Sequence, residues 1–184
     1  MLLFASCHRR EVKLQMEAIS DRSSMPVLDA QQVTTLISDS GVTRYRITAA
    51  EWQIYDQADP PYWEFPQGVY LEQFDNQLNT TSTLRADYAY YDERAENWRL
   101  SGNVQSTNVN GEQFMTPELY WAQKTERVYS DSAITIIQPP TKAAIEAKGD
   151  SAKGTIIKGV GFESNQEMTQ YTIRRPSGIF SVDD

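Results

Sequence analysis

The sequence is poor in the residues that most often carry chemistry. Its 184 residues include one cysteine, Cys7, and one histidine, His8. A single cysteine cannot form an internal disulfide, and zinc sites need several Cys or His ligands, so a metal centre of that kind is excluded. The sequence also lacks a Gly-x-Ser-x-Gly turn and a glycine-rich phosphate loop. We therefore expect no catalytic residue, no metal and no cofactor.

Long apolar runs and clusters of positive charge are absent as well. No stretch reaches the roughly 18 apolar residues that a membrane-spanning helix needs. The net charge is -8 at pH 7, whereas phosphate binding requires clustered Lys and Arg, so nucleic acid is disfavoured as a partner. The chain is long enough for one domain with a real core. We therefore expect a single domain that does not bind nucleic acid.

The start of the chain carries a possible lipidation signal. Residues 2–7 read LLFASC, an apolar run followed by two small residues and a cysteine. This order is typical of the end of a bacterial lipoprotein signal, here truncated because a charged start and a full apolar stretch are missing. The competing interpretation is a disordered tail with an incidental thiol at Cys7. We expect residues 1–32 to comprise the signal end and a disordered tether, and residues 33–184 to form the domain.

From residue 33 onward, apolar and polar residues alternate. Ile134 and Ile136 flank Thr135, for example, and a period of two is typical of half-buried antiparallel strands. Turn signals such as the Asn-Gly pair at residues 110–111 separate runs rich in Tyr, Trp, Thr and Val. No segment shows a helical stripe. The pattern predicts an all-β protein.

The strand pattern repeats along the chain. Residues 46–55, 83–92, 113–122 and 155–164 align in spacing, and each segment is followed by a partner strand. Within each segment one step between inward positions is three residues instead of two, which predicts a bulge or bend at the same level of every unit. Repeated strand pairs that cannot bury their apolar faces alone predict a stacked β architecture. Residues 138–154 form an insertion before the last unit.

Several of these runs resemble the LptC family and its LptA-type, OstA-like relatives. They are RYRITAAEWQIY (44–55), WRLSGNV (98–104), GEQFMTPELYWAQKTERVYSDSAITI (111–136) and GVGFESN (159–165). The resemblance covers about residues 33–175. It implies a V-shaped antiparallel β-jellyroll of two curved sheets, open at both ends and built from repeated strand pairs. It also implies that the interior takes the acyl chains of lipopolysaccharide.

The resemblance further implies partners and a location. A protein of this kind is a non-enzymatic lipopolysaccharide-binding and transfer module of the periplasm. It bridges the inner-membrane LptB-LptF-LptG ABC transporter to an LptA-like protein during export to the outer membrane. The family commonly has an N-terminal transmembrane helix, whereas this chain offers only the short run before Cys7. Anchoring to the inner membrane is then expected through a lipid on Cys7 or through an upstream helix absent from this sequence.

Two sets of site residues follow from the resemblance. The inward residues of the repeats are expected to line the lipid groove, where small residues recurring at one level could leave room for a guest. Unpaired backbone groups of the last strand are expected to template strand addition by the partner. The groove residues are Ile47, Ala49, Trp52, Leu84, Ala86, Ala89, Tyr91, Phe114, Thr116, Leu119, Trp121 and Phe162, and the partner edge is Tyr171, Thr172 and Ile173.

A second interpretation stays open for the same residues. They would close-pack as an ordinary β-sandwich core, which is what such a pattern usually means. The protein would then be a lipid-anchored structural or carbohydrate-binding β-sandwich, with Tyr62 and Trp63 forming an exposed sugar platform. The two hypotheses differ in whether the sheets are open at their ends or closed over by loops.

Overall fold

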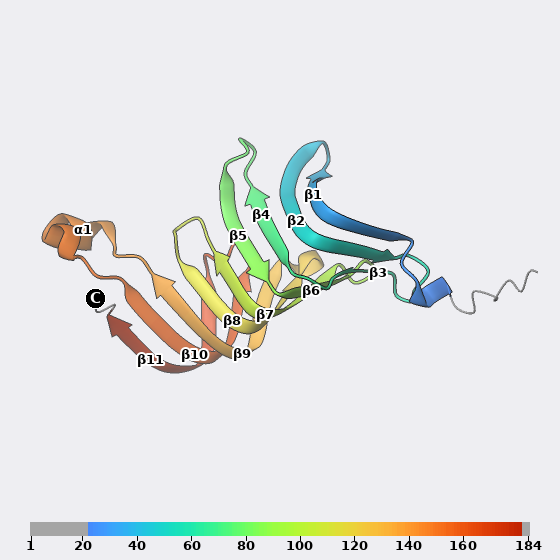
Figure 1. The fold of residues 1–184 in the computed structure, drawn as a ribbon. Helices are drawn as coiled ribbons and strands as arrows, with labels where there is room; N and C mark the ends of the chain where they lie inside the picture. The colour runs from blue at the N-terminus through green and yellow to red at the C-terminus, as the bar shows by residue number, and fades with distance from the viewer. Residues whose placement is uncertain (1–21, 182–184) are drawn as a thin grey trace, which may run out of the picture.

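The protein is built almost entirely from antiparallel strands. The computed structural model describes residues 22–181, and the strand pairs in this range are antiparallel. The prediction of an all-β fold is confirmed (Figure 1). The strands are β1 (Leu28–Asp39), β2 (Val42–Tyr55), β3 (Tyr62–Phe65), β4 (Val69–Phe74), β5 (Thr80–Ala86), β6 (Tyr88–Asp92), β7 (Asn97–Thr107), β8 (Gln113–Ala122), β9 (Arg127–Gln138), β10 (Thr155–Asn165) and β11 (Tyr171–Ser181).

Two strands change partners halfway along their length. Residues 45–49 of β2 pair with β4, whereas residues 53–55 pair with β3. In the same way, residues 105–107 of β7 pair with part of β5 and residues 97–101 pair with β6. The sheet therefore forks into a first arm, which contains β4 and β5, and a second arm, which contains β3 and β6. The two layers expected for the jellyroll are thus two arms of one hydrogen-bonded sheet.

Strands β8 to β11 continue both arms, and they bend at the same level (Figure 1). At the bend the register of pairing shifts, so that neighbouring strands do not stay aligned across it. These shifts agree with the predicted bulge or bend in the third and fourth units, whereas β1 and β2 stay in register from Ala49 to Trp52 in the first unit. The shifts lie between Ser101 and Val104 in β7, between Met115 and Tyr120 in β8, and between Val160 and Phe162 in β10.

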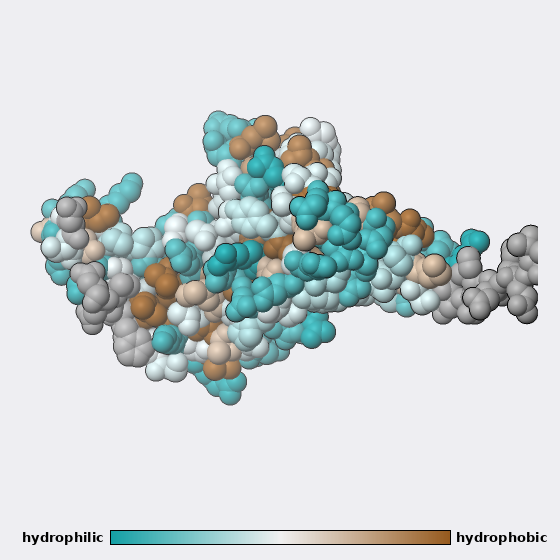
Figure 2. Space-filling model, viewed as in Figure 1, coloured by the Kyte–Doolittle hydropathy of each residue, from teal (hydrophilic) through white to brown (hydrophobic). Residues whose placement is uncertain are grey.

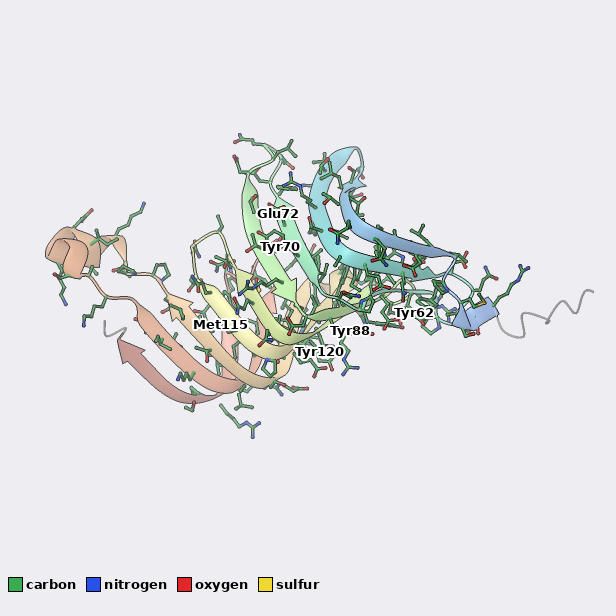
Figure 3. The ribbon with its side chains drawn as sticks, in the orientation of Figure 1. Tyr62, Tyr70, Glu72, Tyr88, Met115 and Tyr120 are labelled. Carbon is green, nitrogen blue, oxygen red and sulfur yellow. The ribbon has the colours of Figure 1, made fainter. Side chains whose placement is uncertain are left out.

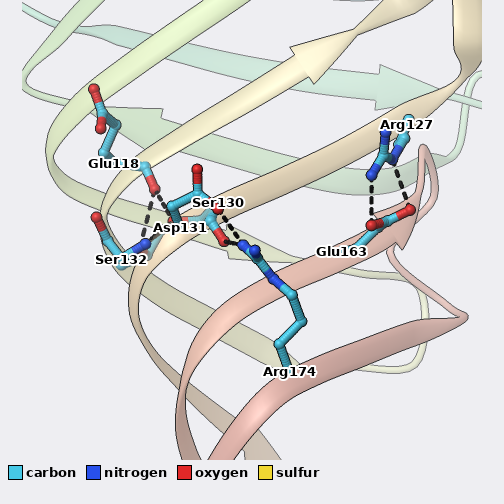
Figure 4. Close-up of polar contacts among 8 residues, drawn as sticks. Glu118, Arg127, Ser130, Asp131, Ser132, Glu163 and Arg174 are labelled. Carbon is cyan, nitrogen blue, oxygen red and sulfur yellow. Dashed lines mark hydrogen bonds and ion pairs between the residues drawn. The ribbon is translucent and has the colours of Figure 1, made fainter.

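Buried hydroxyl groups support the bend. The Ser130 hydroxyl, which is completely buried, donates a hydrogen bond to the Glu118 carbonyl at 2.6 Å, and the Thr116 hydroxyl donates to the same oxygen at 3.1 Å. Figure 4 shows the Ser132 backbone N–H directed at Ser130, to whose hydroxyl it donates at 3.1 Å. A buried carbonyl without a donor costs roughly 1–3 kcal/mol. These hydroxyls therefore stabilise the place where β8 and β9 lose register.

Apolar side chains between the arms form one core. Its members include Phe65, Leu100, Phe114, Ile136 and Phe162, each at most 1% exposed. Complete burial of a side chain of this size contributes roughly 1.5–3 kcal/mol. The core thus joins the two arms along the inside of the V.

The predicted insertion is present and holds a short helix that the sequence analysis did not expect. Helix α1 (Lys142–Lys148) starts after Thr141, whose hydroxyl accepts the Ala144 N–H at 3.2 Å. None of its residues is buried. Figure 1 shows α1 projecting at the end of the sheet that carries β11. Seven residues are too few to display an apolar period, which is why the pattern did not reveal the helix.

The first strand begins before the expected domain boundary. β1 starts at Leu28, which pairs with Ile54 of β2, whereas the domain was expected from residue 33. Short 3-10 turns cover Arg22–Ser24, Gln123–Thr125 and Gly149–Ser151. Cys7 and most of the expected tether lie outside the described residues.

Candidate functional site

The space between the arms forms a trough with two partly enclosed cavities. Cavity A has a volume of about 90 Å³ and lies between Ile37 and Ile47 on one side and Trp63, Tyr91 and Trp98 on the other. These side chains are apolar or aromatic over most of their surface. Cavity A is therefore suited to an apolar guest.

Cavity B lies next to cavity A and has a volume of about 40 Å³. Leu84 and Ser106 of the first arm line it, together with Gln166 and Met168 of the turn between β10 and β11. Because roughly 10–15 Å³ of cavity volume holds one water molecule, each cavity has room for only a few groups of that size. Both cavities are therefore small in this conformation.

The partition between the cavities consists of three side chains. Tyr45, Leu71 and Trp121 line both cavities. The Tyr45 and Trp121 rings meet edge to face with centroids 5.5 Å apart. Movement of this partition would join the cavities into one.

All four tryptophans of the chain belong to the wall of the trough. The Trp52 and Trp63 ring centroids lie 5.1 Å apart, and those of Trp98 and Trp121 lie 6.3 Å apart. Aromatic pairs of this kind contribute about 0.5–1.5 kcal/mol beyond their buried area. The indole N–H groups of Trp52 and Trp98 are buried and have no hydrogen-bond partner among the described residues. The wall of the trough is thus apolar, except for these two indole N–H groups, which donate no hydrogen bond to a described residue.

The predicted groove residues all reach the inside of the V. Ile47, Leu84, Tyr91 and Trp121 line the cavities, while Trp52 packs in the aromatic wall. The remaining residues lie deeper or at the bend. Ala89, Phe114, Leu119 and Phe162 are completely buried, and Ala49, Ala86 and Thr116 are 6–7% exposed.

The recurring small residues mark the bend of the sheet. Ala49, Ala86, Thr116 and Gly159 lie at the level where strands change partner or register. A β-carbon at Gly159 would collide with the side chain of Ile173 on β11. Small residues at this level are therefore needed for packing. At Gly159 the neighbouring side chain already fills the space, so no room is left for a guest.

The turn between β10 and β11 lies across the open side of the trough. The Gln166 side-chain amide donates to the Tyr45 hydroxyl at 3.0 Å and accepts from the Trp121 indole N–H at 3.3 Å. Met168 is 3% exposed, and its carbonyl accepts from the Asn108 side chain at 2.8 Å. Burial raises the pKa of the Tyr45 hydroxyl, and the hydrogen bond from Gln166 partly offsets this shift.

A polar network lies at the β11 end of this turn. The Glu112 carboxylate accepts hydrogen bonds from Asn108 at 2.7 Å, from Gln138 at 2.9 Å and from the Tyr171 hydroxyl at 3.1 Å. Burial raises the pKa of Tyr171 to about 12, and the negative charge of Glu112 adds to the shift. This network ties β11 to the first arm.

The predicted partner edge belongs to β11, an edge strand of the described sheet, whose other edge strand is β1. β11 pairs with β10 alone. Tyr171 and Ile173 pack against the core, whereas Thr172 is exposed. The Asn165 N–H donates to the Gln170 carbonyl. Since bonded pairs alternate along an antiparallel ladder, the backbone groups of Thr172 face β10 and those of Tyr171 and Ile173 face the open side.

Both aromatic residues of the expected sugar platform pack against other aromatic rings. Trp63 lies in the trough wall, 4.9 Å from Tyr91 between centroids. Tyr62 lies on the outer face of the second arm, as do Tyr88 and Tyr120 (Figure 3). Its ring stacks on Tyr55 at 4.5 Å and on Tyr90 at 5.0 Å. The rings therefore cover one another.

Several residues that line the cavities are not among the predicted groove residues. Tyr45 stands two positions before Ile47 in β2, so the period of two could have found it. Leu71 stands two positions after Val69, so the same period applies to it, whereas Gln166 and Met168 lie outside the strands and carry no such signal. Figure 2 shows that this face of the molecule is mainly hydrophilic, with separate hydrophobic patches.

Within residues 22–181, no group of three or more His, Cys, Asp or Glu side chains is placed to hold a metal ion. In the same range no helix has the length and apolar character needed to cross a membrane.

The comparisons with known proteins fit the trough and the repeats. A search of the curated proteins finds no match. A family model described as LptC, lipopolysaccharide-assembly, LptC-related, matches residues 3–166. This range contains all four aligned segments and most of the described sheet. The chain therefore belongs to the LptC-related family, whose members serve in lipopolysaccharide transport and are not enzymes.

Proposed function

We propose that this protein binds lipopolysaccharide in the trough and passes it between an inner-membrane transporter and a periplasmic partner. The observation that carries the proposal is the pair of adjacent cavities, walled by tryptophans, inside a sheet that opens as a V. Each acyl methylene in water costs roughly 0.8 kcal/mol, so a multi-chain lipid needs a continuous apolar surface to cross an aqueous compartment.

The acyl chains would contact the cavity residues first. Ile47, Leu84, Tyr91 and Trp121 are the predicted groove residues that line the cavities. In the proposal, the deeper predicted residues make contact once the arms separate. The indole N–H groups of Trp52 and Trp98 would then find acceptors among the ester and hydroxyl oxygens of the lipid.

The proposed partners are the LptB-LptF-LptG ABC transporter and an LptA-like protein. We assign docking of the LptA-like protein to the open side of β11, at Tyr171, Thr172 and Ile173. An unpaired edge of this kind accepts a further strand through backbone hydrogen bonds. The protein would work in the periplasm, held at the inner membrane by a lipid on Cys7 or by a helix upstream of this sequence.

Tryptophan fluorescence tests lipid binding directly. Because all four tryptophans lie in the trough wall, lipopolysaccharide with brominated acyl chains should quench their emission on contact. Native mass spectrometry of the same samples should show a complex with lipopolysaccharide. The control is a brominated headgroup that carries no acyl chains. If both ligands quench the emission equally and mass spectrometry shows no complex, the result would instead support a closed structural β-sandwich.

The docking edge is tested by a matched pair of variants. Ile173→Pro removes a backbone N–H on the open side of β11, whereas Ile173→Ala loses similar packing but keeps that N–H. We expect the proline variant to bind the LptA-like protein at least about tenfold more weakly than the alanine variant. Equal binding by the two folded variants would place docking elsewhere.

The anchor is tested by Cys7→Ser in the full-length gene. If Cys7 is acylated, the variant should appear in the soluble periplasmic fraction when the transporter is absent. Retention in the membrane fraction would support an upstream helix.

A further inference from the structure

The turn between β10 and β11 closes the trough from the side. Residues 165–171, here called the strap, connect the second arm to the first at three places. Gln166 bonds to Tyr45 of β2, the Met168 carbonyl bonds to Asn108, and the Tyr171 hydroxyl bonds to Glu112. The Gln166–Tyr45 contact joins residues 121 positions apart in the sequence.

The strap is held together by hydrogen bonds of its own. The Asn165 side-chain carbonyl accepts the backbone N–H groups of Thr169 and Gln170, each at 2.9 Å. The Met168 N–H donates to the Asn165 carbonyl at 3.0 Å. Contacts within the strap therefore do not depend on its contacts with the first arm.

The cavities offer little enclosed space for an acyl chain while the strap makes these contacts. Cavities A and B measure about 90 and 40 Å³, and Tyr45, Leu71 and Trp121 separate them. At the bend, by contrast, the arms are joined by the backbone ladder of the sheet and by buried hydroxyls. Side-chain contacts at the open side are thus the easier ones to break.

Gln166 occupies the central position among these contacts. Its single amide group uses its oxygen for the Trp121 indole and its nitrogen for the Tyr45 hydroxyl. Both partners belong to the partition between the cavities. Release of Gln166 would therefore free both partition rings at once.

We infer that an acyl chain enters the trough sideways, between β2 and the strap, and that Gln166 is the residue that holds this entrance closed. Entry breaks the contacts of Gln166 with Tyr45 and Trp121 and merges cavities A and B. The freed hydroxyl, amide and indole N–H then face the ester and hydroxyl oxygens near the head of the chain. This inference rests on the proposed lipid-binding function of the trough.

The rate of acyl-chain entry tests the inference. The full chain is mixed with a brominated fatty acid, 12-bromostearate, and tryptophan quenching is followed by stopped flow. Gln166→Ala removes both hydrogen bonds and should raise the entry rate about tenfold. Tyr45→Phe removes only the hydrogen bond between Tyr45 and Gln166 and should raise the entry rate less. Gln170→Ala is the matched control, because Gln170 is exposed in the same turn and its side chain makes none of these contacts with Tyr45 or Trp121.

A cross-link provides the opposite perturbation. In a Cys7→Ser background, Tyr45→Cys and Gln166→Cys are bridged by a short bismaleimide, and the comparison sample is capped by a monofunctional maleimide. Bridging should slow quenching at least tenfold relative to capping. Equal rates in bridged and capped protein, or an unchanged rate in Gln166→Ala, would overturn sideways entry. Absence of quenching in the unmodified protein by both bromostearate and brominated lipopolysaccharide would instead overturn the lipid-binding function itself.

Discussion

The Arg174 guanidinium on β11 reaches across β10 to the Asp131 carboxylate on β9 (Figure 4). It passes over Gly161, where a β-carbon would approach the Arg174 Nε atom to 2.7 Å. Gly161 also has a φ angle of +79°, in the region that side chains disfavour. The same glycine therefore permits the irregular pairing of β10 with β9 and the contact that spans it.

Gly161→Ala should destabilise the fold by about 1–2 kcal/mol, since alanine at this φ angle is strained. Because the arginine side chain is flexible, its displacement should add only a small part of the loss. Urea denaturation of Gly161→Ala, Arg174→Ala and the double variant measures that part as a coupling energy. A loss that disappears in the Arg174→Ala background would show that contact with Arg174, and not backbone strain, dominates.

Two leucines predicted for the groove should respond differently to a charge. Leu119 is 1% exposed in the core, so Leu119→Arg buries an unpaired charge and should prevent folding. Leu84 lines cavity B and is only partly buried, so Leu84→Arg should fold but lose lipopolysaccharide binding. Circular dichroism together with tryptophan quenching separates the two effects. Full lipid binding by folded Leu84→Arg would remove cavity B from the site.

The repeated pattern allowed the sequence to predict much of the fold. Inward positions such as Ile47 and Phe114 recur with a fixed spacing, and the step of three residues located the bend. These features are local, because a period of two reports which face of a strand a residue occupies. The same period also identified residues in the wall of the trough, since Leu84, Tyr91 and Trp121 lie on the inward face.

The remaining features depend on partners that are distant in the sequence. No local pattern indicates that β2 exchanges β4 for β3, or that Gln166 meets Tyr45. Trp63 and Tyr62 are adjacent, so one must face inward and the other outward, and the pairing register decides which. That register follows from β3 pairing with both β2 and β6, which composition does not reveal.

Removal of the hydroxyl at the bend should also be costly. Ser130→Ala takes a donor from the Glu118 carbonyl and an acceptor from the Ser132 N–H, so we expect a loss of about 1–3 kcal/mol in the free energy of unfolding. Ser132→Ala is the control, because its contact with Ser130 is made by the backbone. Similar losses in the two variants, measured by urea denaturation, would indicate that the Ser130 hydroxyl does not support the bend.

The Tyr171–Glu112 contact predicts how stability changes at alkaline pH. The pKa of Tyr171 is about 12 in the folded protein because the ring is partly buried and its hydroxyl lies beside the Glu112 carboxylate, whereas an unfolded tyrosine titrates near 10. A raised pKa means that the folded state favours the neutral phenol. The resulting stabilisation is fully present below about pH 10 and is lost as the pH rises toward about 12.

Glu112→Gln removes the charge but keeps a group that can hydrogen-bond. The pKa of Tyr171 should then fall toward its usual value without reaching it, because burial, the larger cause, remains. NMR titration of ¹³C-labelled tyrosine, with the Tyr171 signal assigned through Tyr171→Phe, measures the shift. Glu167→Gln serves as the control, since Glu167 is an exposed carboxylate of the same turn that does not contribute to the pKa of Tyr171. An unchanged Tyr171 pKa in Glu112→Gln would mean that burial alone keeps the phenol neutral and that the network does not tie β11 to the first arm through charge.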